Sequence, residues 1–563
     1  MNRPIDPFMT VRGMDSRFDT HEVRNQPAPA AAYNAFDDDA ALSNLVRAQA
    51  GWAADKASKL GRLAGDETVQ EAARLANEHE PKLLTHDRFG NRNDWVEFHP
   101  AWHRLMTLAF THEVHSLAWT SPEPTSHFAR SALSYLWNQV ENGVGCPTGM
   151  AYAAVAGFTG KPGFELWREK TLEAAYDERR LPLQQKRGAV IGYAMTEKQG
   201  GSDLRQTQTT ASYVGPIEGG GEAYSVTGHK WFCSVPVADG FYTLAQTQSG
   251  VSCLFVPRIL PDGTRNRLFI QRLKDKCGNR SNASSEIEYH NTWSMLVGQE
   301  GKGIKEILSH AHLTRLDFAS GSAGLMRQSL TLAIHHAQSR TAFGKRMSEL
   351  PMQTNVLADL SLDSEAAMLG ALRIACATDG AGRDDHEQHL ARVATPVVKF
   401  WNCQRAPYFA YECVQVHGGN GFILEHPMAR LYREAPLNSI WEGTSNMMCM
   451  DVLRAIDRDV RCKDAFIDEL RRSAGQNRTF DRSVQDLIDR LGKTHSSDGH
   501  ARGLVTRMAY LLQAAQMLKH SPADVAELFI VSRLGGEWMH VYGTLPDSAS
   551  LNSIVQRAAV VKH

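Results

Sequence analysis

The residues with the clearest chemical potential lie in the segment SIWEGTSN, residues 439–446. Glu442 stands between Trp441 and Gly443. An apolar ring against a carboxyl group raises the pKa of that group by desolvation, and such a carboxylate can remove a weakly acidic proton from carbon. Gly443 leaves space beside the carboxyl for a substrate. The alternative interpretation is a plain helix start, capped by the hydroxyl and amide residues that follow.

Two further segments could bind a flat, polar ring. In YAMTEKQGGSD, residues 193–203, paired glycines let the backbone turn tightly, and Thr196 and Ser202 offer hydroxyls to a ring edge. In GHKWFCSV, residues 228–235, an aromatic pair precedes the hydroxyl of Ser234. The alternatives are a glycine-rich turn for the first segment and a half-buried strand for the second.

Two segments could bind phosphates. RTAFGK, residues 340–345, places Arg340 and Phe343 where they could meet a phosphate and an adenine. QVHGGNGF, residues 415–422, has three glycines in four residues, which bares backbone N–H groups for a pyrophosphate. Each could equally be a helix end followed by a glycine turn.

The elements that must position these residues follow from hydrophobic periodicity. Residues 1–40 predict an irregular arm, residues 41–180 predict helices, and residues 189–297 hold short β-prone runs broken by turn residues. The chain after residue 301 is again helical. Four long helices are expected there, at Ile304–His312, Leu325–Arg340, Met352–Thr378 and Val393–His417. Helices continue to the C-terminus, with a loop at residues 493–501.

The predicted fold class is mainly α with a central β domain. We expect an arm and α-helical domain at residues 1–187, a middle β domain at 188–298, a four-helix bundle at 299–457 and an additional helical domain at 458–563. A chain of 563 residues is too long for one core, which agrees with several units. A cofactor at their junction is expected, since pockets favour domain interfaces.

Composition narrows the class of protein. Lys and Arg number 61 against 62 Asp and Glu, which argues against coating nucleic acid by net charge alone. Nine scattered cysteines without a CxxC pair predict reduced thiols and no metal site. The N-terminus lacks an apolar signal segment and no run of 18 apolar residues occurs, so we expect a cytoplasmic protein that does not span a membrane.

Together, in this order and spacing, the segments resemble the acyl-CoA dehydrogenase family over about residues 140–455. Gln199 departs from the first family pattern, which has Gly there. The resemblance implies FAD as cofactor, Glu442 as the catalytic base and Arg315 beside it. It implies ring contacts from Tyr193, Met195, Thr196, Gly201, Ser202, Phe232 and Ser234. It implies further FAD contacts from Ile440, Trp441, Thr444 and Asn446. In a neighbouring subunit it implies contacts to the ADP part from Arg340, Phe343, Gln415 and Gly419.

MTEKQGGSD, GHKWFCSVP, RLKDKCGNRSNAS and NSIWEGTSNMMCMDVLR are more specifically similar to the AidB-like, alkylation-response members of that family. The helical tail after Arg454 also fits them. This resemblance implies four domains, a homotetramer, weak dehydrogenase activity on isovaleryl-CoA, and binding of double-stranded DNA through the C-terminal domain. A conventional acyl-CoA dehydrogenase is the alternative. A nitroalkane oxidase-like enzyme is a weaker one, because those relatives use Asp where this chain has Glu442.

Residues 456–563 hold 15 Lys and Arg against 13 Asp and Glu, a net charge of +2. DNA-binding domains often carry more. Without a helix-turn-helix or zinc finger pattern, any binding should be directed at the backbone and weakly sequence-specific. A solvated helix surface is the competing interpretation. The candidate DNA contacts are Arg454, Arg471, Arg472, Arg478, Arg502, Arg507 and Lys519.

Overall fold

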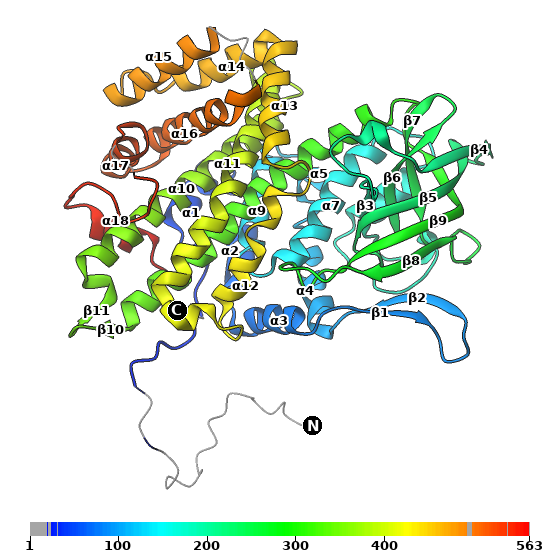
Figure 1. Ribbon diagram of the computed structural model, residues 1–563, viewed down its shortest axis with the longest axis horizontal. Coiled ribbons are helices and arrows are strands. Elements are labelled where there is room, and N and C mark those ends of the chain that lie inside the picture. The colour runs from blue at the N-terminus through cyan, green and yellow to red at the C-terminus, as the bar shows by residue number, and fades with distance from the viewer. Residues whose placement is uncertain (1–19, 21–23, 31, 493–497, 537–538, 562–563) are drawn as a thin grey trace.

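The computed structural model describes residues 20, 24–30, 32–492, 498–536 and 539–561 (Figure 1). Most of the arm predicted for residues 1–40 and most of the loop predicted for residues 493–501 lie outside these ranges. Within them, no helix combines the length and apolar character that crossing a membrane requires.

The N-terminal part is helical, as predicted, except for one β-hairpin that periodicity missed. The helices are α1 Ala40–Gln49, α2 Ala54–Ala64, α3 Glu67–Glu78, α4 Pro100–Thr111, α5 Leu117–Thr120, α6 Ser126–Trp137, α7 Asn142–Phe158 and α8 Glu165–Leu172. The hairpin pairs β1 (Lys82–His86) with β2 (Arg92–Glu97) and extends beneath the β domain in Figure 1. Asp87 closes its turn, because its carboxylate accepts the backbone N–H groups of Phe89 at 2.8 Å and Asn91 at 2.9 Å.

The middle part forms a barrel-like sheet. Its strands are β3 Ile191–Ala194, β4 Thr210–Pro216, β5 Glu222–Ser234, β6 Gly240–Thr247, β7 Gly250–Pro257, β8 Leu268–Leu273 and β9 Ser284–Leu296. β4 pairs with β5, β5 with β9, β9 with β7, β7 with β6, and β6 returns to β4, so the sheet closes on itself. The strand runs expected at residues 224–227, 241–246, 251–256, 268–273 and 287–289 all lie within these strands.

Two of the predicted bundle helices, Ile304–His312 and Leu325–Arg340, are in fact one helix. α9 runs unbroken for 37 residues, from Gly303 to Ser339. The small residues between the two predicted helices lie inside α9 and serve packing: a Cβ on Gly324 would lie 2.3 Å from the Tyr135 carbonyl oxygen of α6. Glycine therefore lets α9 and α6 approach closely.

The remaining helices complete the bundle and the C-terminal unit. They are α10 Pro351–Gly380, α11 Asp385–His417, α12 Pro427–Glu434, α13 Ser445–Arg458, α14 Val460–Arg471, α15 Arg478–Gly492, α16 Ala501–His520, α17 Ala523–Leu534 and α18 Leu551–Ala558. A two-residue hairpin, β10 (Thr341–Ala342) with β11 (Lys345–Arg346), follows α9.

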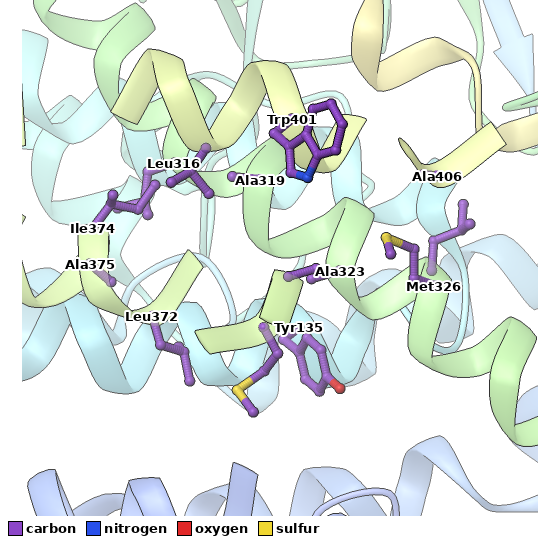
Figure 2. Packing of buried hydrophobic residues seen from close by; sticks show 14 of the residues in the cluster. Tyr135, Leu316, Ala319, Ala323, Met326, Leu372, Ile374, Ala375, Trp401 and Ala406 are labelled. Atoms are coloured by element: carbon purple, nitrogen blue, oxygen red, sulfur yellow. The ribbon is translucent and has the colours of Figure 1, made fainter. Parts of the chain in front are cut away.

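Side chains from α6, α9, α10 and α11 interdigitate in the bundle core, where Tyr135, Ala323, Leu372 and Trp401 are buried (Figure 2). One cluster of buried apolar side chains runs from Tyr33 to Ala558, so the N-terminal helices, barrel, bundle and C-terminal unit share a continuous interior. Helices α14, α16 and α18 pack on α10 and α11, and α15 and α17 pack on α16.

Candidate active site

Glu442 lies on the loop between a short turn at Leu437–Ser439 and helix α13. Its φ is +54°, a left-handed conformation that is strained for a residue with a Cβ. Two cations fix this loop. Lys399 of α11, which is fully buried, donates to the carbonyl oxygens of Trp441 at 3.0 Å and Gly443 at 2.7 Å, and Arg315 of α9 donates to that of Glu442 at 3.2 Å. Three successive carbonyls are thus held in place.

The Glu442 carboxyl is poised as a base. Part of the residue reaches solvent in the single chain, but burial of its carboxyl raises the pKa above the ordinary value. Arg315, Thr314 and Lys399 oppose that shift. Arg315 is itself anchored to Asp451 of α13 at 2.8 Å. The carboxyl therefore sits in a desolvated place beside cations that keep it from becoming permanently neutral.

Trp441, predicted as an apolar wall beside the Glu442 carboxyl, packs on helix α9. The Trp441 ring stacks on Phe318 of α9 with centroids 4.9 Å apart, and its indole N–H donates to Asn438 Oδ1 at 2.9 Å. Ile440 is exposed, and so is Thr444, which precedes α13 and makes no side-chain cap hydrogen bond. The stacking and the hydrogen bond fix the Trp441 ring, and the Thr444 hydroxyl remains available for a ligand.

The structure brings the two ring-binding segments together. The backbone N–H of Trp231 donates to the Thr196 carbonyl at 2.7 Å, which ties the turn after β3 to strand β5. Phe232 is 47% exposed beside it. The residues expected to face the ring thus lie on adjacent segments: Met195, Thr196, Gly201 and Ser202 on the turn, and Phe232 and Ser234 on β5.

A buried ion pair that sequence reasoning missed holds this turn. Lys230 Nζ lies 2.7 Å from Glu197 Oε1, and both side chains are almost fully buried. Glu197 also accepts the backbone N–H groups of Gln208 at 2.7 Å and Thr209 at 3.1 Å. The lysine in the middle of a strand was the available signal, since a buried lysine requires a partner.

Tyr193 of β3 packs against side chains of β6 and α9. Its ring stacks on Tyr242 with centroids 5.3 Å apart, and its hydroxyl lies 3.1 Å from His310 Nδ1 of α9. Burial raises its pKa well above the ordinary value, and the negative charge of Glu442 adds to the shift. Tyr193 therefore belongs to the surroundings of the candidate base.

The residues expected to bind ADP gather elsewhere. Arg340 donates to the Asn25 carbonyl at 2.6 Å, Phe343 is 95% exposed, and Gln415 donates to Glu412 at 3.0 Å. A Cβ on Gly419 would meet open space. Arg340 directly follows α9 and lies 25 residues after Arg315, so at about 1.5 Å per residue these two arginines lie roughly 37 Å apart. One chain does not bring them together.

The predicted DNA contacts are unequal. Arg471 pairs with Asp468, Arg472 with Glu469, and Arg507 with Asp486, so their charges are partly neutralised. Arg502 donates to Asn446 Oδ1 at 2.7 Å, which joins the C-terminal unit to the candidate active site. Three others are exposed and form no ion pair within the described residues: Arg454, Arg478 and Lys519.

The chemistry of these surfaces fits a flavin dinucleotide. The exposed Phe232 ring, with the hydroxyls of Thr196 and Ser234 nearby, suits a flat ring with a polar edge. The exposed Phe343 beside Arg340 suits an adenine with phosphates, and the bare backbone at Gly418 and Gly419 leaves room for a pyrophosphate.

Comparison with known families decides the assignment. Residues 192–292 match the family described as acyl-CoA dehydrogenase, middle domain, and residues 301–456 match acyl-CoA dehydrogenase, C-terminal domain. The chain belongs to the acyl-CoA dehydrogenase family. Residues 25–178 match the adaptive response protein AidB N-terminal domain. As a member of this family, the chain is an FAD-dependent oxidoreductase.

Individual relatives place it on the AidB branch. AidB of Escherichia coli (strain K12) is 42% identical over 514 residues, covering 90% of this chain and 93% of that protein. Acyl-CoA dehydrogenase family member 11 of Caenorhabditis elegans is 28% identical over 74% of this chain and 69% of its own length. The AidB likeness spans the C-terminal unit as well as the dehydrogenase core.

Solved structures agree on the fold. The crystal structure of Caenorhabditis elegans ACDH-11 in complex with C11-CoA superposes with a TM-score of 0.83 at 22% identity, covering 98% of this chain and 95% of that one. An acyl-CoA dehydrogenase complexed with FAD from Bacillus anthracis gives a TM-score of 0.65 at 16% identity, covering 90% and 91%.

Proposed function

We propose that this chain is an AidB-like flavoprotein of the adaptive response to DNA alkylation, which binds double-stranded DNA and retains weak acyl-CoA dehydrogenase activity, for example on isovaleryl-CoA. The observation that carries the catalytic part is Glu442, whose backbone is held by Lys399 and Arg315 and whose carboxyl is desolvated. The observation that carries the biological part is the 42% identity to AidB, which covers 90% of the chain.

In the proposed reaction, the Glu442 carboxylate removes the α proton of an acyl-CoA thioester. The raised pKa makes it a stronger base than an ordinary glutamate, and the positive charges of Arg315 and Lys399 oppose that rise. Trp441, held by Phe318, walls the site from solvent. Bound FAD supplies the acceptor for the hydride that leaves the β carbon.

The distance between the two FAD-binding clusters supports a site shared between subunits of a homotetramer. Arg340, Phe343, Gln415 and Gly419 would then serve the ADP part of an FAD whose ring binds a neighbouring chain. Large apolar side chains crowd the same end of the bundle, and such exposure marks a protein interface. They are Phe343 at 95% exposure, Met352 at 85%, Phe422 at 70%, Leu424 at 66% and Ile423 at 51%.

DNA binding would use the cations that are not neutralised within the chain. Arg454, Arg478 and Lys519 are the stronger candidates, because Arg471, Arg472 and Arg507 already pair with carboxylates. The protein would protect DNA in the cytoplasm by covering it or by inactivating alkylating agents. Tetramer symmetry would multiply the few cations that each chain presents.

A DNA titration at several salt concentrations tests this part. Contacts to phosphates make the logarithm of affinity fall linearly with the logarithm of salt concentration. A steep negative slope with a random duplex supports the DNA-binding function. Absence of binding at low salt overturns it while leaving the dehydrogenase assignment intact.

A conventional short- or branched-chain acyl-CoA dehydrogenase is the second candidate, and the complete Glu442 site favours it. Anaerobic addition of acyl-CoAs separates the two. Fast bleaching of the flavin at rates of common enzymes, about 1–10³ s⁻¹, would favour the conventional enzyme. Slow bleaching combined with salt-dependent DNA binding would favour the AidB-like function.

A further inference from the structure

The segment between β8 and β9 places a lysine behind the strand that carries Ser234. Lys276 Nζ donates to the Asn282 carbonyl oxygen and lies 3.3 Å from Ser284 Oγ at the start of β9. Ser284 stands directly opposite Ser234 in the antiparallel pairing of β9 with β5, and their hydroxyl oxygens are 3.5 Å apart. Three side chains therefore connect this segment to a residue that is expected to face the flavin ring.

The lysine sets the direction of these hydrogen bonds. An ammonium group has three donors and no acceptor, so the Ser284 oxygen accepts from Lys276. The proton of the Ser284 hydroxyl is then available to Ser234 Oγ, and the proton of Ser234 is available to a third group. A serine oriented in this way presents a donor to the edge of a bound ring.

The charge of Lys276 is not cancelled by a carboxylate. Lys274 pairs with Glu286 at 2.6 Å, whereas Lys276 forms no ion pair within the described residues. Burial lowers the pKa of Lys276 to about 8, so the ammonium is mainly charged at pH 7. Burial raises the pKa of nearby Glu434 to about 7, so this acid carries only part of a negative charge at the same pH.

The other titratable neighbours of Lys276 leave its charge in place. Glu80 and Arg280 pair with each other. Cys146 of α7 lies beside Lys276 and Ser234, and burial raises the pKa of its thiol to about 12, so the thiol stays neutral. One desolvated positive charge therefore remains next to the ring-binding strand.

We propose that Lys276 is a positioning residue that raises the reduction potential of the bound flavin through Ser284 and Ser234. The proposal rests on the proposed ring-facing role of Ser234. Reduction adds negative charge to the ring, so a nearby cation and a donor hydroxyl stabilise the reduced form more than the oxidised form. Loss of either should make the flavin harder to reduce.

The experiment measures the midpoint potential of the flavin in FAD-loaded protein against a reference dye during anaerobic reduction, with no acyl-CoA present. In Lys276→Met, the ratio of oxidised to reduced flavin at a fixed potential should rise at least about tenfold. For a two-electron couple this is a shift of about 30 mV to lower values. Ser284→Ala should shift the potential in the same direction. Lys276→Arg keeps the charge and should restore most of the native potential.

Lys186→Met is the matched control. Lys186 is also a buried lysine, and it donates to the Arg179 carbonyl oxygen at 2.9 Å outside the ring-binding segments. This variant should lower the melting temperature and leave the flavin potential unchanged. Equal shifts of potential in Lys186→Met and Lys276→Met would overturn the proposal, because the potential would then follow a general loss of stability.

The remaining outcomes separate the role of Lys276 from that of the site. A native potential in Lys276→Met, or the same lowered potential in Lys276→Arg as in Lys276→Met, overturns the proposal. If Lys276→Met does not bind FAD, Ser284→Ala carries the same test, and a native potential in that variant overturns the route through the hydroxyls. An unchanged potential in Ser234→Ala removes Ser234 from the ring edge and overturns the proposal with it, while FAD binding and DNA binding are measured independently.

Discussion

Among the acidic side chains enclosed by protein, Asp363 and Glu442 have opposite surroundings. Asp363 of α10 accepts hydrogen bonds from Arg405 at 2.9 Å, Arg533 at 2.9 Å and Tyr542 at 2.7 Å, and these partners hold its pKa near 2 despite burial. Glu442 lies on a strained backbone, its carboxyl has few donors, and its pKa is raised.

The difference in hydrogen bonding distinguishes an acidic residue that stabilises the fold from one that is suited to catalysis. The Asp363 network joins α10 and α11 to the C-terminal helices and is satisfied on every side. At Glu442 the buried cations Lys399 and Arg315 bond backbone carbonyls instead, so the loop is fixed while the carboxyl stays reactive. Burial of an acidic side chain does not by itself indicate a function. A buried acidic side chain whose hydrogen bonds are not satisfied does indicate one.

The largest expected effect on stability comes from removing the Asp363 carboxylate. Asp363→Ala removes the carboxylate that pairs with both buried Arg405 and buried Arg533, and breaking such a pair costs about 3–5 kcal/mol. Urea unfolding followed by circular dichroism measures this. The surface acid Asp468, which pairs with exposed Arg471, is the control, and Asp468→Ala should change the free energy of unfolding by less than about 0.5 kcal/mol. Similar losses in both variants would remove the distinction.

A smaller effect is expected next to the base. Gly443 has φ +100°, and a Cβ there would lie 2.6 Å from Met448 Cε, the flexible end of a side chain. Gly443→Ala should therefore cost about 1–3 kcal/mol through backbone strain and slow flavin bleaching by acyl-CoA. Gly492→Ala, which would meet no atom within 4 Å, should be neutral in both assays. Full activity in Gly443→Ala would mean that the loop conformation is not critical.

The contributions of Glu442 and Asp363 to stability should also change in opposite directions with pH. The pKa of Glu442 is raised in the folded protein. Its contribution to the free energy of unfolding is therefore present at low pH and is lost as pH rises above the ordinary value near 4.3. The pKa of Asp363 is lowered, so its contribution is present above the ordinary value near 3.9 and is lost as pH falls toward about 2.

Unfolding free energies across pH for native protein, Glu442→Gln and Asp363→Asn measure this. The difference in unfolding free energy between the native protein and Glu442→Gln should shrink as pH rises, by at most about 1.4 kcal/mol per pH unit. The advantage of native over Asp363→Asn should shrink as pH falls. Parallel trends in the two variants would contradict the comparison.

The smallest expected effect is on DNA. Arg478→Ala should lower the salt slope of binding by about 1, because an unpaired cation that meets a phosphate releases one counterion. Arg471→Ala should change it little, since Asp468 already lies 3.2 Å from that guanidinium. Equal effects would show that ion pairing within the chain does not select the DNA contacts.

Much of the site could be predicted from the sequence because its signals are local. The ring-binding turn, the aromatic strand and the Trp441-Glu442-Gly443 run each combine adjacent residues whose types suit one ligand. Strands β5 to β9 were also predictable from short β-prone runs, whereas no run was identified at β3 or β4. The hairpin at residues 82–97 was missed because its short strands lie within otherwise helical sequence.

What could not be predicted depends on partners far apart in the chain. Lys399 contacts the Glu442 loop across more than forty residues of sequence, and Arg315 does so across more than one hundred. Arg533 contacts Asp363 from the C-terminal unit. Helix α9 was predicted as two shorter helices, whereas it is continuous and Gly324 within it packs against α6. Side-chain pairing of this kind is set by the assembled fold.

The most direct test of the central claim is the rate of flavin bleaching when isovaleryl-CoA is mixed anaerobically with FAD-loaded native protein and with Glu442→Gln. The account predicts bleaching in the native protein and a loss of at least about 10²–10⁴-fold in the variant, with FAD content and melting temperature retained. Equal bleaching in both proteins would contradict the assignment of Glu442 as the base.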